Sequence, residues 1–182
     1  MDTKCREYRK ALMDFAEVLS YPSSETSKHA ANCSSLLEDS EASHLMNSFS
    51  SYLGSHSLGR VSEVYTRTFD LQPSCSPYVG DHLFGDGYRR GEFLVRLKER
   101  CAECGIDFGN ELPDHISVIL RLLAHVEGTE AVDLIDLCLS PALGRMLGSL
   151  NDDRNPYNWA LQALSRTIRP PQIASPLKRE MN

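Results

Sequence analysis

Hydrophobic residues recur every three to four positions along most of the chain, which is the spacing of one buried face of an α-helix. The first such stripe consists of Tyr8, Leu12, Phe15 and Leu19, and its helix should end before Pro22. The polar, serine-rich segment that follows contains apolar positions typical of two short helices: Leu36, Leu37, Leu45, Met46, Phe49 and Leu53.

The middle of the chain is divided by proline and glycine. One helix is predicted by a stripe of four apolar residues, Val61, Val64, Tyr65 and Phe69. It should end at Pro73, because proline cannot donate the backbone hydrogen bond of a continuing helix. We then expect a short helix from about Pro77, a break at 85–87 where glycine is frequent, and a long helix to about Cys104.

The second half of the chain is also helical in pattern, with further helices expected at about 113–126, 129–139, 141–150 and 156–168. The sequence contains no alternation typical of β-strands, no hairpin signal and no repeat of fixed period. It therefore predicts an all-α, single-domain bundle of about eight or nine helices over residues 1–168. Residues 169–182 contain three prolines and few apolar residues, and we expect them to form a mobile tail.

Composition narrows the classes of function. The net charge of −6 over 182 residues argues against a nucleic-acid-binding protein, which would normally present a basic face. The start of the chain carries charges where a signal peptide has its apolar stretch. The longest apolar run, 116–126, is interrupted by Arg121 and is too short to span a bilayer. We therefore expect a cytoplasmic protein without direct membrane insertion, either monomeric or dimeric, whose six cysteines are thiols.

Cys101 and Cys104 form a CxxC pair, a motif of zinc sites and of redox-active thiols. A structural zinc site needs four ligands and usually two such pairs, whereas this chain has a single pair. A thioredoxin-like site would belong to a strand–helix–strand unit, but both cysteines lie at the end of a predicted helix. The motif therefore predicts plain thiols, with no bound metal and no cofactor.

Four residues allow an alternative function. His82 and Asp86 are four positions apart and would share one face of a helix, where they could supply half of a metal-ligand set. Together with Asp114 and His115 they would suit a metal-dependent helical hydrolase. The Asp-His order is the reverse of that in helical metal-dependent phosphohydrolases, and no upstream histidine has the spacing to complete such a site.

The tripeptide Pro113-Asp114-His115 introduces the longest apolar run of the chain. Proline suits the first helical turn, because its missing N–H group would have no partner there. An aspartate in that turn complements the positive end of the helix dipole, which leaves the histidine unexplained. His115 is therefore expected to be either neutral and hydrogen-bonded or in contact with a partner, and the sequence leaves both alternatives open.

Acidic residues are concentrated between residues 103 and 136. This segment has a charge of −7, from one arginine, Arg121, and from the acids Glu103, Asp107, Glu111, Asp114, Glu127, Glu130, Asp133 and Asp136. Such a run usually marks solvated helix faces. The alternative interpretation is an anionic surface that attracts a basic segment of a partner and accelerates their encounter.

Three blocks in register resemble a known family: VYTRTFDL at 64–71, SPYVGDHLFGDGYRRGEFLVRL at 76–97 and ELPDHISVILRLLA at 111–124. They are similar to the NarJ branch of the TorD, DmsD and NarJ group of cytoplasmic chaperones, which mature molybdenum-cofactor oxidoreductases. The resemblance implies an all-helical protein that is not an enzyme. Members of the group bind the catalytic subunit of a respiratory reductase, often at its N-terminal twin-arginine leader, until the cofactor is inserted.

The resemblance also implies a partner and a site. The partner would be the catalytic subunit of a molybdenum-containing oxidoreductase, a nitrate reductase or a relative, recognised through its leader peptide. The client-binding residues would be Tyr78, His82, Leu83, Phe84, Asp86, Arg90, Glu111, Pro113, Asp114 and His115. One departure concerns Arg121, which stands where relatives commonly have a glutamate and which suggests a client with a different leader.

Overall fold

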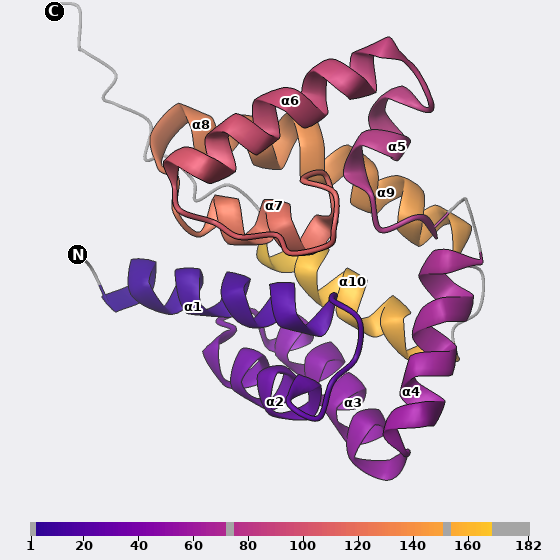
Figure 1. The fold of residues 1–182 in the computed structure, drawn as a ribbon. Coiled ribbons are helices and arrows are strands. Elements are labelled where there is room, and N and C mark those ends of the chain that lie inside the picture. Colours follow the sequence, from indigo (N-terminus) through magenta and orange to yellow (C-terminus); the bar gives the residue numbers. More distant parts are fainter. Residues whose placement is uncertain (1–2, 72–74, 151–153, 169–182) are drawn as a thin grey trace, which may run out of the picture.

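Helices make up the computed structural model of the protein, which describes residues 3–71, 75–150 and 154–168 (Figure 1). Along the chain the elements are α1 (Thr3–Val18), α2 (Thr26–Leu36), α3 (Ser40–Ser55), α4 (Leu58–Tyr65), η1 (Thr66–Asp70), α5 (Val79–Phe84), α6 (Tyr88–Glu103), α7 (Ile116–Leu123), α8 (Gly128–Asp133), η3 (Leu134–Leu139), α9 (Ser140–Ser149) and α10 (Pro156–Thr167), where η denotes a π-helical turn. Within these residues the β-type pairing is limited to one isolated bridge, so the predicted all-α fold is confirmed. The tail predicted at 169–182 lies outside the described residues.

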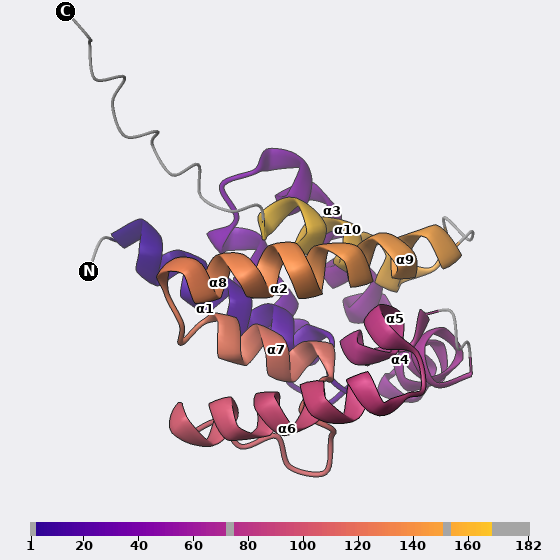
Figure 2. The ribbon, with the colours of Figure 1, turned by 90° about the horizontal axis from the view of Figure 1, so that it is seen from above.

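The described elements join into nine continuous helical runs, because α4 continues into η1 and because α8, η3 and α9 follow one another without a break. Figure 2 shows α8 and α9 as parts of one long rod. We predicted two separate helices here, at 129–139 and 141–150. The π-helical turn explains the difference: it widens the backbone just ahead of Pro141, whose ring would clash with the carbonyl four residues earlier in a regular helix.

Several helix starts follow local sequence rules. The side chains of Asp39 and Ser57 accept hydrogen bonds from backbone N–H groups in the first turns of α3 and α4. Asn155 does the same for α10, where Pro156 occupies the first turn. Each cap satisfies a donor that has no partner within its own helix, and the loss of such a cap costs about 1 kcal/mol of stability.

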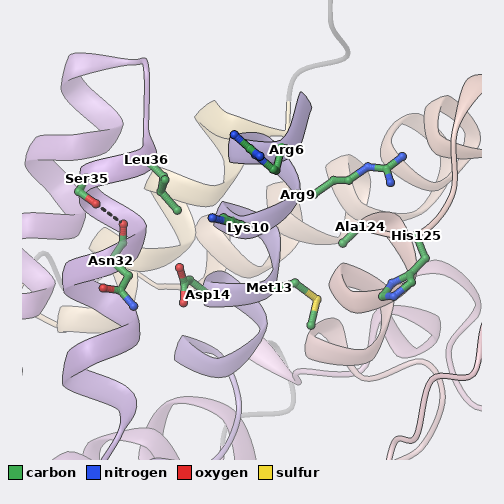
Figure 3. Close-up of a pocket in the computed structure, with 10 residues that line it drawn as sticks. All are labelled: Arg6, Arg9, Lys10, Met13, Asp14, Asn32, Ser35, Leu36, Ala124 and His125. Carbon is green, nitrogen blue, oxygen red and sulfur yellow. Dashed lines mark hydrogen bonds between the residues drawn. The ribbon is translucent and has the colours of Figure 1, made fainter. Parts of the chain in front are cut away.

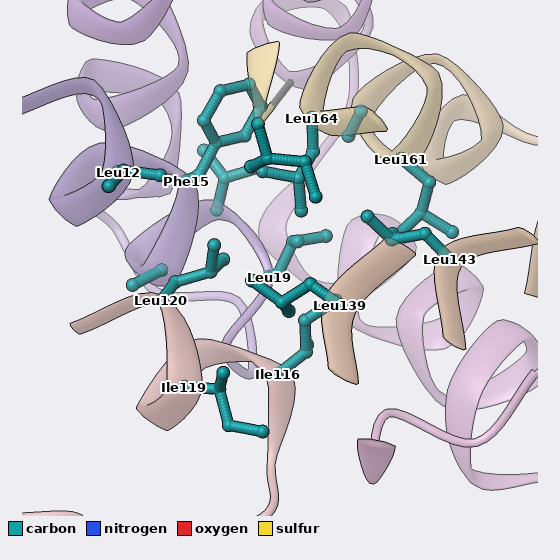
Figure 4. Close-up of a cluster of buried hydrophobic side chains, with 14 of the residues drawn as sticks. Leu12, Phe15, Leu19, Ile116, Ile119, Leu120, Leu139, Leu143, Leu161 and Leu164 are labelled. Carbon is teal, nitrogen blue, oxygen red and sulfur yellow. The ribbon is translucent and has the colours of Figure 1, made fainter. Parts of the chain in front are cut away.

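The core is built around α7, in which every residue except Arg121 is buried. Figure 4 shows Ile116, Ile119 and Leu120 of this helix among side chains of the surrounding helices. The first helix lies against α2 and α7, and the last lies against α3 and α9, so both parts of the chain contribute to one apolar cluster. Burial of each leucine or isoleucine of this kind contributes about 1.5–3 kcal/mol to stability.

None of the described helices, α7 included, has both the length and the apolarity that a membrane span requires.

Tyr157, in the first turn of α10, is the largest fully buried side chain of the described core. Its ring centroid lies 5.2 Å from that of Phe49, 5.6 Å from that of Tyr65 and 5.1 Å from that of Phe69. These rings come from α3, α4 and η1, and each tilted or edge-to-face pair adds roughly 0.5–1.5 kcal/mol beyond the area that it buries. Through Tyr157, the last described helix therefore fills the corner between α3 and α4 with a packed aromatic ring.

Candidate functional site

The segment that precedes α7 is paired with the segment that precedes α5. The backbone N–H of Val79 donates to the carbonyl of Asp114 (2.8 Å), and that of Ile116 donates to the carbonyl of Pro77 (2.8 Å). These two bonds flank one antiparallel residue pair. We predicted a helix from about 113, and that start is wrong. The helix begins at Ile116 instead, because the pairing already uses backbone groups that an earlier start would need.

We term the side chains around this pairing the junction: Tyr78, Asp81, Arg90, Asp114 and His115. Arg90, in the first turn of α6, connects most of them. It donates from Nε to Asp114 Oδ2 (3.0 Å) and from Nη1 to Asp81 Oδ1 (2.7 Å). Its guanidinium carbon also lies 5.7 Å from the centroid of the Tyr78 ring, at a cation–π distance. One arginine therefore ties α5, α6 and the approach to α7 together.

Asp114 is a carboxylate whose side chain has no exposed surface. Arg90 binds its Oδ2 atom, whereas Oδ1 has no hydrogen-bond partner in the described part of the protein. Burial raises the pKa of Asp114, and the bond from Arg90 opposes that shift. A buried charge of this kind is tolerated only while its partner is in place. Asp114 is thus an internal brace of the junction, meaning a buried partner that holds Arg90 against the segment before α7.

Gly80 packs directly against this carboxylate and offers a test of the brace. A Cβ atom at Gly80 would lie 2.5 Å from Asp114 Oδ2 and 3.2 Å from Phe93 Cδ1. We therefore expect Gly80→Ala to lower the free energy of unfolding by about 2 kcal/mol, because the buried carboxylate and its partner must shift. Urea unfolding measures this change.

Gly91 supplies the matched control for this substitution. It also lies in a helix, but a Cβ atom there would meet nothing within 4 Å. Gly91→Ala should stabilise the protein by about 0.5–1 kcal/mol through helix propensity. Effects of the same sign and size at the two glycines would contradict the close packing of Gly80 on Asp114.

His115 caps α7 as a neutral side chain. Its Nδ1 atom accepts a hydrogen bond from the backbone N–H of Ser117 (3.2 Å) and lies 2.7 Å from Ser117 Oγ. Burial lowers the pKa of His115 to about 4. Its ring meets that of Tyr78 edge to face, with the centroids 5.4 Å apart. Of the two alternatives that the sequence leaves open, the structure shows the neutral, hydrogen-bonded histidine.

The ten residues predicted to bind a client differ in their access to solvent. The buried residues are His82, Pro113, Asp114 and His115. The half-buried residues are Tyr78, Leu83 and Arg90. The exposed residues are Phe84, Asp86 and Glu111. The buried set therefore positions the junction from inside, and a partner could touch only the other two sets.

Exposed apolar and acidic side chains border the junction from the α5–α6 turn and from the loop before α7. We term this set the rim: Phe84, Asp86, Tyr88, Glu111 and Leu112. The exposed fractions are 41% for Phe84, 82% for Tyr88 and 45% for Leu112. The hydroxyl of Tyr78 donates to Glu111 Oε2 (2.9 Å), which fastens the loop to the junction. Burial and this bond raise the pKa of Tyr78 to about 12, so the hydroxyl keeps its proton at neutral pH.

The residues of the alternative metal site do not converge. Gly85, with φ of +63°, ends α5, so Asp86 lies beyond the helix and shares no helical face with His82. The Nε2 atom of His82 is 2.7 Å from the carbonyl oxygen of Ser76, and the Asp86 side chain is 96% exposed beside Arg90. Within residues 3–71, 75–150 and 154–168, no three His, Cys, Asp or Glu side chains are grouped to hold a metal ion. The geometry therefore gives the helical-hydrolase alternative no site.

The two cysteines of the CxxC pair are free thiols in different surroundings. Cys101 is fully buried in the core, whereas Cys104 is half-buried where α6 ends. Burial raises the pKa of Cys101, which keeps this thiol protonated and a poor nucleophile. The assignment of both residues as plain thiols stays a prediction.

The acidic segment 103–136 does not form one anionic surface. Arg100 binds Glu130 through two hydrogen bonds, from Nε (2.5 Å) and from Nη2 (2.8 Å). Glu127 forms an ion pair with Arg9 of α1, and a third acid of the segment is the buried carboxylate of the junction. The charge available to a basic partner is therefore smaller than the sequence count of −7, because several acids have partners outside the segment.

Arg121 faces α1 and not the rim. Its Nη2 atom donates to Glu17 Oε1 (3.0 Å), and this ion pair joins α7 to α1 on a partly exposed surface. The departure from the family pattern at this position is accommodated by packing between two helices. The suggestion that Arg121 marks a client with a different leader stays a prediction.

Sequence reasoning missed three contributors to this region: Asp70, Gly80 and Asp81. Asp81 binds Arg90, and the acid at position 70 lies close enough to influence the pKa of both Tyr78 and His115. No local pattern marks these roles, because each depends on the pairing of two distant segments. The available signal was the family resemblance, since the block at 64–71 contains Asp70 and the block at 76–97 contains Gly80 and Asp81.

The chain is similar to known proteins in sequence and in fold. A family model described as nitrate reductase delta subunit matches residues 37–142. The nitrate reductase molybdenum cofactor assembly chaperone NarJ of Escherichia coli, from strain K12 and from O157:H7, is 31% identical over 70 residues, which are 38% of this chain and 30% of that protein. The aligned part thus spans less than a third of the length of these relatives. A solved structure from Archaeoglobus fulgidus, assigned as a redox enzyme maturation protein, has a TM-score of 0.62 and 21% identity, covers 87% of this chain and 91% of its own, and shows the same fold.

Proposed function

Because the chain belongs to the nitrate reductase delta subunit family, whose model matches more than half of it, we propose that it is a maturation chaperone and not an enzyme. Its client is the catalytic subunit of a molybdenum-cofactor oxidoreductase, a nitrate reductase or a relative. The chaperone holds this subunit until the cofactor is inserted and has no cofactor of its own. The names of the Escherichia coli relatives state such a role for nitrate reductase and support this kind of partner.

The observation that carries the proposal is the rim beside the junction. Its apolar members stay exposed, although most of the other large apolar side chains in residues 3–71, 75–150 and 154–168 are buried or half-buried. Large apolar side chains that a globular protein leaves exposed beside a fixed ionic cluster are candidates for an interaction site. The rim also lies within the residues that the family model matches, 37–142, so the part of the chain that defines the family contains this surface.

The exposed side chains of the rim suit the leader peptide of the client by polarity and by charge. Phe84 and Leu112 offer contacts for its apolar side chains, while Asp86 and Glu111 are exposed acids that favour basic ones. The ion pairs of the junction hold both edges of the rim in place before binding. A pre-organised surface loses less conformational entropy when it binds, so a short peptide suffices for a specific, reversible complex.

Affinity capture from the native host, followed by titration calorimetry, tests the proposal. A tagged chain should capture the catalytic subunit of a molybdenum enzyme in its cofactor-free form. A synthetic peptide of that subunit's N-terminal leader should then bind the purified chain with a moderate dissociation constant, on the order of micromolar. Capture of the cofactor-loaded subunit alone would contradict the proposal, since a maturation chaperone releases its client after loading.

A substitution in the rim should weaken the leader complex. We expect Leu112→Asp to raise the dissociation constant of the leader peptide roughly tenfold or more, because it replaces an apolar contact with a charge that must be desolvated. Leu58→Asp is the matched control, since Leu58 is 49% exposed against 45% for Leu112 but lies at the start of α4, away from the rim. If both variants weaken binding equally, the rim is not the leader site.

A further inference from the structure

A second surface, of opposite charge, lies where α1 passes between α2 and the end of α7. It is an open cup of about 660 Å³. Figure 3 shows Lys10 of α1 on the side of α2, while Arg9 and Met13 point toward Ala124 and His125, which follow α7. Its lining combines apolar and basic side chains. We term this surface the basic cup, lined by Arg6, Arg9, Lys10, Met13, Leu36 and His125 among others.

The positive charge of the basic cup is only partly compensated inside the protein. Arg6, Arg9 and Lys10 follow helical i, i+3 and i+4 spacing, which places three like charges on one face of α1. Arg9 is paired with a glutamate, but Arg6 and Lys10 form no ion pair within the described residues. The acid that lines the cup, Asp14, is already bound to a histidine of α2 (2.7 Å). This excess of positive charge stands out in a chain whose net charge is −6.

The shape of the basic cup favours a segment of a protein over a small molecule. Small-molecule sites usually enclose about 70–90% of the ligand surface, and an open cup with exposed edges cannot do so. A helix laid across it would place apolar side chains on Met13 and Leu36 and acidic ones beside Arg6 and Lys10. Met13 is 37% exposed, so an apolar surface is available there without rearrangement.

We infer that the basic cup binds an acidic, amphipathic segment of the client, at a place separate from the leader site. The identification of the partner as the client rests on the proposed function. The two surfaces lie at opposite ends of α7: His115 caps its start beside the rim, and Ala124 follows its end beside the basic cup. Eight helical residues span about 12 Å, so one folded client could engage both surfaces at once. Binding at two linked places raises the overall affinity by effective concentration.

An array of overlapping peptides that covers the captured client subunit tests this inference. The full chain should bind the leader peptide and at least one acidic, amphipathic segment elsewhere in the subunit. The variant Arg6→Glu/Lys10→Glu should bind that acidic segment roughly tenfold more weakly, with the leader peptide unaffected. The matched control is Arg96→Glu/Lys98→Glu, which makes the same change of charge at exposed positions of α6.

The possible outcomes separate this inference from the proposed function. Leader binding without any acidic segment overturns the inference and leaves the chaperone role intact. An acidic segment that binds without the leader supports the inference and removes the leader from the proposed function. Equal losses in the two charge-reversal variants would show a general effect of charge and overturn the inference. Competition with inorganic pyrophosphate gives one further outcome. If pyrophosphate displaces the acidic peptide when its concentration is lower than that of the peptide, the basic cup is a small-anion site and the inference is overturned.

Discussion

Replacing Asp114 with alanine should lower the free energy of unfolding by about 3 kcal/mol, the range found when one partner of a buried ion pair is removed. The carboxylate is fully buried and binds Arg90, whose own side chain is only 15% exposed. Without it, the guanidinium stays partly desolvated beside an empty space. The remaining bond to Asp81 keeps the loss toward the lower end of that range. Urea unfolding followed by circular dichroism measures the change.

Asp86→Ala is the control for this prediction, because Asp86 contacts the same guanidinium at 3.4 Å but is 96% exposed. Exposed ion pairs contribute little, so this variant should unfold almost like the parent chain. If the two aspartate variants lose the same free energy of unfolding, the burial of Asp114 does not contribute to stability and Asp114 is not a brace. Any loss of leader binding in Asp114→Ala should follow its loss of folded protein, since this side chain does not reach solvent.

The free energy of unfolding should fall as the pH is lowered from 6.5 toward 4, because His115 resists protonation in the folded protein. In the unfolded chain the imidazole takes up a proton near its ordinary value of 6.5, whereas burial lowers its folded pKa to about 4. Because the pKa of His115 is lower in the folded protein, its contribution to stability is complete at pH values above the pKa in the unfolded chain. This contribution is lost as the pH falls toward the pKa in the folded protein. Linkage over this shift gives a loss on the order of 3 kcal/mol.

His115→Asn isolates this contribution from the titration of the nearby carboxylates Asp70 and Glu111. Asparagine is a good helix cap and can accept the hydrogen bond from the Ser117 backbone, but it does not titrate. Unfolding curves of both proteins should therefore be compared at several pH values between 7 and 4. The stability of the variant relative to the parent should rise as the pH falls. Parallel stability curves for the two proteins would show that His115 is not buried as a neutral group.

The helical pattern was predictable because it depends on neighbours along the chain. Of the predicted stripe, Tyr8, Leu12 and Phe15 lie in α1 and Leu19 directly follows it, and the last three are buried. Asn155 caps the last described helix. The start of α7 was not predictable in this way. It depends on backbone bonds to residues 77–79, more than thirty positions earlier, which no local propensity reveals.

The sequence predicted which residues lie at the candidate site better than it predicted what each of them does there. The family resemblance pointed to Asp114 and His115, and the structure brings both to the junction. A sequence does not reveal that a charged residue is buried when its partner is 24 positions away, as Arg90 is from Asp114. The acidic segment was overestimated for the same reason. Glu127 finds its partner, Arg9, 118 positions earlier.

The position of Tyr157 has a consequence for synthesis on the ribosome. A nascent chain that has already released α3, α4 and η1 still lacks the ring that fills the space between Phe49, Tyr65 and Phe69. That corner closes only after α10, which ends at Thr167, has left the exit tunnel. Until then the earlier helices expose apolar surface that is prone to aggregation. A chain proposed to bind an immature client therefore passes through an interval of its own synthesis in which its own fold is incomplete and its apolar surface is exposed.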